Sequence, residues 1–344
     1  AIQKAKCNIE AFHKSQQKQE DVVETMPGVF CWRENRAIDK VGLYIPGGSA
    51  PLFSTVLMLA IPAMLAGCRE VIMCSPCNAG GEIHPAILYC AQITGVHKVY
   101  KLGGAQAIAA MAYGTQTVPA VYKIFGPGNQ YVTAAKQLVQ IAGVAIDMPA
   151  GPSEVCILAD GDAHPGFIAA DLLAQAEHGP DSQVILVTTS ESLVDKCLEE
   201  IDRQVSDLPR KNIAVRALAN SRAIVVKGMS EAVQLADQYA AEHLILHCNN
   251  ADEIAAQITN AGSVFIGPYS PESVGDYASG TNHTLPTNGF ARAYSGVSTD
   301  SFVKKITYQK LTKEGLNNIA DTVMVMATEE GLQAHAAAVK IRIG

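Results

Sequence analysis

The first half of the chain alternates between short apolar runs and longer segments with a helical period. The apolar runs are typical of buried strands and lie at residues 31–34, 41–45, 71–74, 98–102 and 121–125. Between most of them the apolar positions recur every three or four residues, as on one face of a helix. Strands that alternate with helices at this spacing form βαβ units, so this half predicts a parallel sheet.

The second half repeats the alternation. Its predicted strands lie at residues 154–159, 183–188, 223–226, 244–247 and 263–266. Two halves of this kind predict two doubly wound α/β domains, with a ligand bound between the carboxyl ends of their strands.

Both ends of the chain have a helical pattern. Ile2, Ala5, Ile9 and Phe12 mark one face of a first helix. From about residue 299 the pattern changes to a helix and a further short segment, which are too small to fold alone and could dock on their own chain or on a partner subunit. We therefore expect an α/β fold of two Rossmann-like open parallel-sheet domains with a small C-terminal helical tail domain.

Composition narrows the functional classes. The chain has 344 residues, of which 48% are hydrophobic and 17% charged, so it can bury a large core. A net charge of -7 argues against binding to nucleic acid. No membrane span is expected, because the most apolar run, residues 56–61, is soon interrupted by Pro62. No signal peptide is expected either.

The nine cysteines are odd in number and have no short repeating frame, which suits a reducing compartment and a cytoplasmic protein. Cys74 and Cys77 form one CxxC pair, which could be redox-active or half of a zinc site. No second pair exists, and we interpret both as structural or incidental cysteines.

Three glycine-containing turns follow predicted strands, at residues 46–51, 103–106 and 125–129. None has the G-x-G-x-x-G pattern of dinucleotide-binding proteins. The backbone N–H groups of the third turn could approach a diphosphate, and Asn129 could bond a ribose, although a plain tight turn would have the same sequence. Three such turns in one predicted sheet favour a nucleotide or phosphate ligand.

Gln175 and His178 lie three residues apart, where Gly179 and Pro180 end a predicted helix. On a helix this spacing places both side chains on one face, while Glu177 points elsewhere. The pair could be half of a metal or substrate site, and a histidine that caps the helix is the alternative.

Glu242 and His243 form an adjacent acid and base directly before a predicted strand. Either could transfer protons in a reaction, and a solvated pair on a loop is the alternative. Asp276 lies in a long polar loop, residues 271–283, of a kind that is usually functional.

With Gln175 and His178, Asp276 would complete an oxygen, nitrogen and oxygen ligand set that suits catalytic zinc. His335 is the natural fourth ligand, because it is the only histidine in the C-terminal part. We assign the other histidines, at positions 13, 84, 97, 164 and 247, to the surface or the core.

Together these segments resemble the histidinol dehydrogenase family over nearly the whole chain. The residues that carry the resemblance are 41–50, 103–109, 125–129, 147–154, 175–181, 242–244 and 275–283. The resemblance implies a first domain of residues 1–43 and 155–298, a second of residues 44–154 that contacts NAD, and a dimerisation tail of residues 299–344.

The resemblance also implies the site. One Zn²⁺ per subunit would be bound by Gln175, His178 and Asp276 of one subunit and by His335 of the other, in a homodimer that exchanges its C-terminal tails. The residues implied to hold L-histidinol are Ser153, Gln175, His178, His243, Asp276, Glu330 and His335. Those implied to contact NAD are Tyr44, Gln106 and Asn129.

The implied reaction oxidises L-histidinol to L-histidine through the aldehyde, with two NAD and one water. His243 would take the protons, and Glu242 would activate the water that adds to the aldehyde. Family members normally have a substantial stretch before the position of Ala1, and the connection at residues 138–143 is short for the family.

Three other functions remain open on the sequence. A related zinc and NAD dehydrogenase could oxidise another polar amino alcohol or a diol. A zinc hydrolase could use Glu242 on a metal-bound water without any nucleotide. A catalytically inactive interaction protein would use zinc for stability alone.

Overall fold

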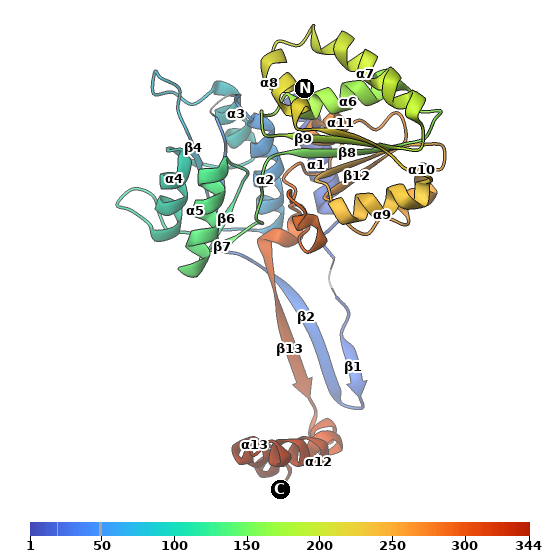
Figure 1. The fold of residues 1–344 in the computed structure, drawn as a ribbon. Coiled ribbons are helices and arrows are strands. Elements are labelled where there is room, and N and C mark those ends of the chain that lie inside the picture. Colours follow the sequence, from blue (N-terminus) through green and yellow to red (C-terminus); the bar gives the residue numbers. More distant parts are fainter. Residues whose placement is uncertain (19, 48–49) are drawn as a thin grey trace. The chain divides into compact units, whose positions relative to one another are not determined.

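The chain forms two compact units in a computed structural model that describes residues 1–18, 20–47 and 50–344. The first unit consists of residues 1–16 and 38–302, and the second of residues 17–37 and 303–344. Figure 1 labels most of their helices and strands. Gly48 and Ser49 of the first predicted glycine turn lie outside the described residues.

The first unit contains two parallel sheets, and the sheet nearer in sequence to the N-terminus has the strand order β5-β4-β3-β6-β7. Its strands are β3 (Lys40–Tyr44), β4 (Glu70–Ser75), β5 (Lys98–Lys101), β6 (Lys123–Phe125) and β7 (Ala145–Ile146). Its helices are α2 (Phe53–Ala66), α3 (Pro85–Ile93), α4 (Gly104–Tyr113) and α5 (Gln130–Ile141). Alternate strand residues point to opposite faces, so Leu43 packs in one core with α2 while Ile72 packs in another with α4.

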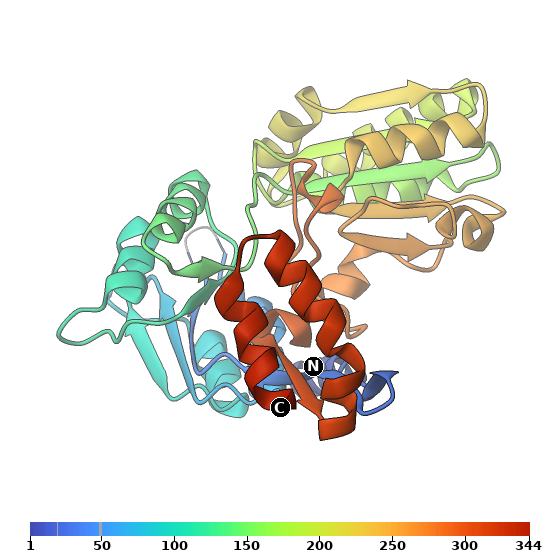
Figure 2. The ribbon, with the colours of Figure 1, turned by 90° about the horizontal axis from the view of Figure 1, so that it is seen from below.

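The other parallel sheet has the order β10-β9-β8-β11-β12. Its strands are β8 (Glu154–Ala159), β9 (Gln183–Thr188), β10 (Arg222–Val225), β11 (His243–His247) and β12 (Ser263–Ile266). Its helices are α6 (Pro165–Ala176), α7 (Glu191–Val205), α8 (Lys211–Ala219), α9 (Met229–Tyr239), α10 (Ala251–Ala255) and α11 (Glu272–Tyr277). The N-terminal helix α1 (Ile2–Lys14) packs on α2 of the other sheet. Helices cover both faces of this sheet in Figure 2. The predicted pair of Rossmann-like sheets is therefore present.

The sequence suggested that Pro62 interrupts the apolar run at residues 56–61. In the structure Pro62 lies inside α2, and the helix continues past it. A proline has no N–H to donate to the carbonyl four residues earlier, which here belongs to Met58. That carbonyl instead accepts a hydrogen bond from Asn282 Nδ2 at 2.6 Å. The side chain of Asn282 is buried, so a distant polar segment satisfies the group that Pro62 leaves free.

The second unit combines three antiparallel strands with two helices. The strands are β1 (Val23–Met26), β2 (Val29–Ala37) and β13 (Val303–Leu311), and the helices are α12 (Lys313–Glu329) and α13 (Gln333–Ile343). β2 pairs with β13 from Ala37↔Val303 to Val29↔Leu311. Trp32 stacks on Tyr308 with ring centroids 5.4 Å apart.

The pairing of β2 with β13 changes the expected domain limits. Residues 17–37, expected in the first domain, group with residues 303–344 because their backbone hydrogen bonds go to β13. β3 begins at Lys40 and belongs to the same sheet as β4 and β6, so the second expected domain begins before residue 44. The tail is thus built from both ends of the chain.

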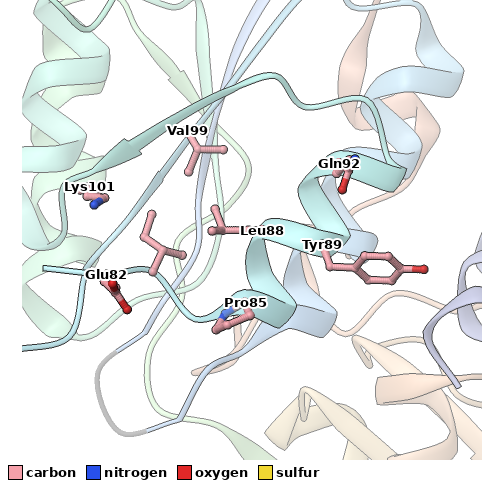
Figure 3. Close-up of a pocket in the computed structure, with 8 residues that line it drawn as sticks. Glu82, Pro85, Leu88, Tyr89, Gln92, Val99 and Lys101 are labelled. Atoms are coloured by element: carbon pink, nitrogen blue, oxygen red, sulfur yellow. The ribbon is translucent and has the colours of Figure 1, made fainter. Parts of the chain in front are cut away.

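Two further features bear on function. A pocket of about 580 Å³ lies between α3 and the edge strand β5, and Leu88 and Val99 are among the residues that line it (Figure 3). None of the expected site residues lines this pocket. In the described part of the chain, none of the helices has the length and apolar character of a membrane span.

Candidate active site

A pocket of about 1230 Å³ in the first unit is lined by residues from both parallel-sheet regions. Five of the residues expected at the site line it, namely Tyr44, Gln106, Asn129, Ser153 and His178. The pocket is therefore large enough for a substrate and part of a nucleotide, and it brings the three residues expected to contact NAD together with Ser153 and His178.

The pocket wall on the side of the first sheet is made of backbone turns that approach each other closely. The hydroxyl of Tyr44 accepts a hydrogen bond from the N–H of Gly104 at 3.0 Å. A Cβ on Gly126, which has φ +126°, would lie 2.1 Å from the carbonyl oxygen of Tyr44. Glycine is thus required at position 126 for both its conformation and its lack of a side chain.

Asn129 follows this turn as the N-cap of α5. Its Oδ1 accepts hydrogen bonds from the N–H groups of Tyr131 and Val132, each at 3.1 Å. The capping function is the one expected of an asparagine at this position. Because Oδ1 is occupied by the cap, the amide nitrogen of this exposed residue is the group left for a ligand.

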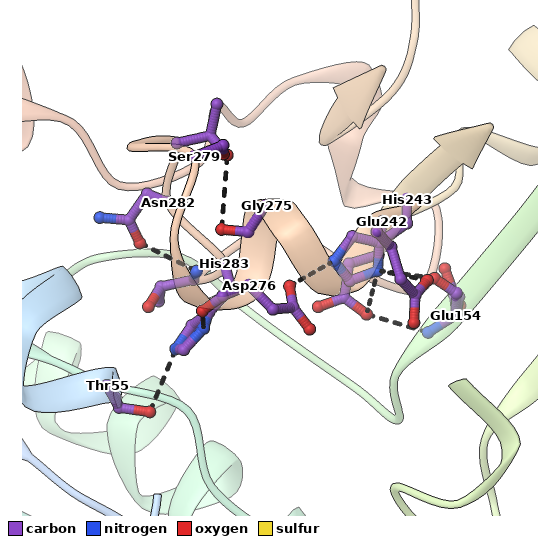
Figure 4. A network of polar contacts seen from close by, with 12 residues as sticks. Thr55, Glu154, Glu242, His243, Gly275, Asp276, Ser279, Asn282 and His283 are labelled. Atoms are coloured by element: carbon purple, nitrogen blue, oxygen red, sulfur yellow. Dashed lines mark hydrogen bonds and ion pairs between the residues drawn. The ribbon is translucent and has the colours of Figure 1, made fainter. Parts of the chain in front are cut away.

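His243 is the first residue of β11, and its side chain is buried. Nδ1 lies 3.2 Å from the carbonyl oxygen of Glu154, and since a carbonyl only accepts, Nδ1 carries a proton. Nε2 faces Asp276 Oδ1 at 3.5 Å (Figure 4). Beyond this contact, the structure gives neither atom a hydrogen-bond partner among the described residues. Nε2 is therefore the ring nitrogen at which a proton can be gained or lost.

Glu242 is held by the same strand neighbour as His243. Its Oε2 accepts a hydrogen bond from the N–H of Glu154 at 2.9 Å. β8 and β11 are paired in parallel at this point, with His243 opposite Val155, so the backbone of Glu154 contacts both residues of the acid and base pair. The pair is thus buried at the start of a strand and is no solvated loop pair.

Asp276 lies on a short helix, α11, and not in the continuous polar loop that the sequence suggested. Glu272 in the first turn and Asp276 are four residues apart, which places both carboxylates on one face of this helix. Both are buried. Sequence reasoning missed Glu272, although its i, i+4 spacing from Asp276 was the signal that could have identified it.

Gln175 is fully buried, and its amide has one orientation that satisfies both ends. In that orientation its nitrogen donates to Glu272 Oε1 at 2.8 Å, and its oxygen accepts from the N–H of Glu154 at 2.9 Å. The oxygen keeps one lone pair for a further donor or a metal.

His178 lies beyond the end of its helix, because α6 stops at Ala176 with Glu177 as its C-cap. Its N–H still bonds to the carbonyl of Gln175 at 3.2 Å, which closes the turn and keeps the two residues together. The side chain of His178 is exposed, whereas that of Gln175 is buried.

Three side chains in this region could hold a metal ion. Ligand atoms of His178, Glu272 and Asp276 all lie within 4.8 Å of one another. This nitrogen and oxygen donor set suits zinc at a catalytic site. The structure thus brings His178 and Asp276 together, as the sequence predicted, and places Glu272 beside them.

The electrostatics of the cluster couple its acids to His243. Burial raises the pKa of Glu242 to about 7, against the opposing charge of His243. Burial likewise raises the pKa of Glu272 to about 8. Burial alone would lower the pKa of His243, yet the carboxylates of Glu242, Glu272 and Asp276 raise it to about 10. The cluster therefore binds protons as a unit.

His283, not singled out from the sequence, connects the first sheet's helices to this cluster. Its Nδ1 donates to the carbonyl of Asp276 at 2.9 Å, and its Nε2 lies 3.1 Å from the hydroxyl of Thr55 on α2 (Figure 4). Glu154 was also missed as a site residue, and its Oε1 accepts from the N–H of Asn288 at 2.9 Å.

Glu330 and His335 belong to the second unit. Glu330 is the C-cap of α12, and His335 lies in α13. Both are exposed.

The nine cysteines are all free, including buried Cys74 and exposed Cys77.

Comparison with known proteins agrees with this picture. The sequence matches the model of the histidinol dehydrogenase family over residues 1–343. Histidinol dehydrogenase of Bacteroides fragilis (strain YCH46) is 61% identical over 343 residues, which cover 100% of this chain and 80% of that protein. The crystal structure of histidinol dehydrogenase from Elizabethkingia anophelis has a TM-score of 0.98 and 58% identity, covering 100% of this chain and 79% of that one.

A more distant structure shares the fold alone. An acetylating aldehyde dehydrogenase from Geobacillus thermoglucosidasius is 14% identical with a TM-score of 0.58, and the match covers 88% of this chain and 81% of that one.

The family match and the 61% identical relative define the class of this α/β protein, which is an enzyme of the oxidoreductase class. The chain belongs to the histidinol dehydrogenase family.

Proposed function

We propose that this enzyme oxidises L-histidinol to L-histidine through L-histidinal, the last step of histidine biosynthesis, with NAD and one Zn²⁺ per subunit. The observation that carries the proposal is the cluster at the edge of the pocket. There a histidine with a free Nε2, two raised-pKa acids and a metal-capable donor set lie together.

The donor set fits zinc. Asp276 Oδ1 is buried without a hydrogen-bond partner among the described residues, and ligand atoms of His178 lie within 4.8 Å of those of Asp276. We assign Gln175, His178 and Asp276 as ligands, with His335 of a second copy as the fourth. Glu272 Oε1 accepts a hydrogen bond from the amide nitrogen of Gln175, which turns the amide oxygen toward the other donors of the site. Bound zinc supplies a Lewis acid that orients the amino alcohol.

The pocket fits a nucleotide. Tyr44, Gln106 and Asn129 line it, and the N-terminus of α5 provides backbone N–H groups of the kind that bind phosphate. We assign these three residues to NAD, which supplies the hydride acceptor. Ser153, in the same pocket, and Glu330 are assigned to the substrate together with the metal-site residues and His243.

His243 is the base in this account. Its Nδ1 proton is fixed on the carbonyl of Glu154, so Nε2 accepts the proton of the substrate hydroxyl. The charge of Asp276 is one cause of the raised pKa of His243. Use of Asp276 as a metal ligand cancels part of that charge and brings the pKa of His243 down toward the range in which histidine acts as a base.

Glu242 acts in the second half of the reaction. With a pKa of about 7, a fraction of its carboxyl groups is ionised at neutral pH and can take a proton from the water that adds to the aldehyde. The N–H of Glu154 fixes Oε2 of Glu242, so the other oxygen is the one that meets the water.

The free cysteines support a reducing, cytoplasmic location, and the tail supports a homodimer. Val325, Met326, Leu332 and Ile341 of the helical hairpin are all exposed apolar residues. A second copy of the tail is the partner that we propose for this surface, by exchange of the C-terminal segments.

The test separates this function from its rivals. Titration calorimetry should show NAD binding to the wild-type protein, whereas a zinc hydrolase would bind none.

An apoenzyme shown to be metal-free should be inactive and regain histidinol oxidation with zinc. Zinc content should fall in Asp276→Asn and be largely kept, with weaker affinity, in Glu272→Gln. Normal turnover without metal, or oxidation of another amino alcohol in preference to histidinol, would defeat the proposal.

A further inference from the structure

Both backbone polar groups of Gly126 are bound by charged side chains. Asp147 Oδ2 accepts the hydrogen bond of the Gly126 N–H at 2.7 Å. Lys136 Nζ donates to the Gly126 carbonyl at 2.9 Å and also pairs with Asp147 Oδ1. The two side chains come from α5 and from the residue after β7, so the pair clamps the turn between the strand β6 and the helix α5.

The pair is deeply buried, which makes it costly as a stability device. The side chains of Lys136 and Asp147 are 4% and 1% exposed. Removing two charges from water costs several kcal/mol per ion, and a well-packed apolar pair is often at least as stable. A buried ion pair of this kind is better explained by the geometry that it enforces.

That geometry concerns the pocket. Gly126 has φ +126° and touches the backbone of Tyr44, and the three residues after it, Pro127, Gly128 and Asn129, all line the pocket. Asp147 is further fixed through Oδ1, which accepts the N–H of Met148 at 2.8 Å. The clamp therefore lies directly behind the wall that carries Asn129 and the N-terminus of α5.

We propose that Lys136 and Asp147 are positioning residues for the nucleotide, which hold the 126–129 turn in the conformation that NAD binds. The inference rests on the proposed function, because it requires NAD to occupy this pocket. It gives a role to Asp147, which belongs to a segment of the family resemblance and touches none of the assigned ligands. Without the clamp, the turn samples conformations that do not bind, and the apparent affinity falls with the competent fraction.

The test uses the full-length holoenzyme with Lys136→Met and Asp147→Asn. At a temperature well below unfolding, calorimetry should show a rise in the NAD dissociation constant of about tenfold or more, with the binding stoichiometry per subunit unchanged. The affinity for L-histidinol should be unchanged, and KM for NAD should rise more than kcat falls. A general loss of folded protein would instead lower the stoichiometry and leave the dissociation constant alone.

The matched control is Lys98→Met on the same sheet, which removes the exposed ion pair of Lys98 with Glu70, 2.6 Å apart, and should leave NAD binding as in the wild type. Lys136→Gln keeps a donor for the Gly126 carbonyl and should weaken NAD binding less than Lys136→Met. Variants that bind NAD like the wild type overturn the clamp. Failure of Lys136→Gln to fold would also overturn the proposal, because the ion pair would then be needed for the folding of the domain and not specifically for NAD binding. Absence of NAD binding in the wild type would instead overturn the proposed function.

Discussion

At the scale of single residues, the site depends on backbone contacts that fix otherwise mobile protons. The carbonyl of Glu154 sets the tautomer of His243, and the N–H of Glu154 contacts both Glu242 and the amide oxygen of Gln175. The backbone of one residue, Glu154, thus contacts the base, the acid and a proposed metal ligand. A β8 residue can do this because β8 and β11 are neighbours in the sheet.

Asp171 offers a residue-scale prediction about pH. Burial in α6 raises its pKa from 3.8 to about 6. Below pH 3.8 the group is protonated in both the folded and unfolded states and has no effect. As pH rises past 3.8, the unfolded chain ionises first, so the folded state loses stability until about pH 6, by at most ~3 kcal/mol. Asp171→Asn should therefore raise stability at pH 8 by about 1–2 kcal/mol and far less at pH 4.

Urea unfolding at the two pH values measures this difference. Asp202→Asn, at an exposed position of α7, is the control and should change stability at neither pH by more than about 0.5 kcal/mol. An equal gain from Asp171→Asn at pH 4 and pH 8 would show that the ionisation of Asp171 is not responsible.

The sequence singled out most residues of the candidate site, whereas only the structure shows their contacts. Glu242, His243, Gln175 and His178 were predicted because an acid and base at a strand entry and a pair at a helix end leave local patterns. Glu154 acts through its backbone, which no side-chain pattern reveals.

At the scale of elements, α2 is completed by a residue far away in the sequence. Asn282 supplies the hydrogen bond that Pro62 cannot, and its Oδ1 accepts the N–H of Thr284 at 2.9 Å. The neighbouring His283 bonds to the carbonyl of Asp276. The polar segment that follows α11 is therefore tied to α2 on one side and to the site on the other.

Asn282→Ala should destabilise the protein by about 1–3 kcal/mol, since the carbonyl of Met58 would be buried without a partner. Pro62→Ala restores an N–H at the position that can bond this carbonyl. The double variant should therefore be more stable than the sum of the single effects predicts, with a coupling of about 1 kcal/mol. Denaturant unfolding of the four proteins measures the cycle, and strictly additive effects would contradict this account of Pro62.

The strands predicted for the two parallel sheets lie close to their observed bounds, because each is a short apolar run bounded by turn residues. The two-residue strand β7 and the helices α7 to α10 were not predicted individually. α11 was missed because it has six residues and lies in a segment rich in glycine and serine. β2 was predicted as a strand and expected in the first domain, whereas it pairs with β13 more than 260 residues later, a contact that no local pattern reveals.

At the scale of the whole molecule, the account requires two chains for one complete site. Glu330 and His335 lie in the unit made from residues 17–37 and 303–344, whereas the other assigned residues lie in the first unit. The tail has exposed apolar residues on both of its helices. An exchanged tail would bury them and supply the fourth zinc ligand to the partner.

Subunit mixing tests this arrangement. Glu242→Gln and His335→Ala homodimers should each be inactive for a different reason. With exchanged tails, both substitutions of a hybrid dimer fall in one of its two sites. The second site then has a wild-type Glu242 and a wild-type His335, so hybrid dimers should regain activity at that site. A mass-resolved label must confirm that subunits have exchanged. Activity that stays absent in confirmed hybrids would indicate that His335 acts within its own chain.

A four-electron oxidation at one zinc and NAD site is measured by the yield of NADH for each L-histidinol consumed. The purified zinc-loaded enzyme, with limiting L-histidinol and excess NAD, should form two NADH for each L-histidinol and release L-histidine as the product. A yield of one NADH with L-histidinal as the product, or no NADH at all, would contradict the account.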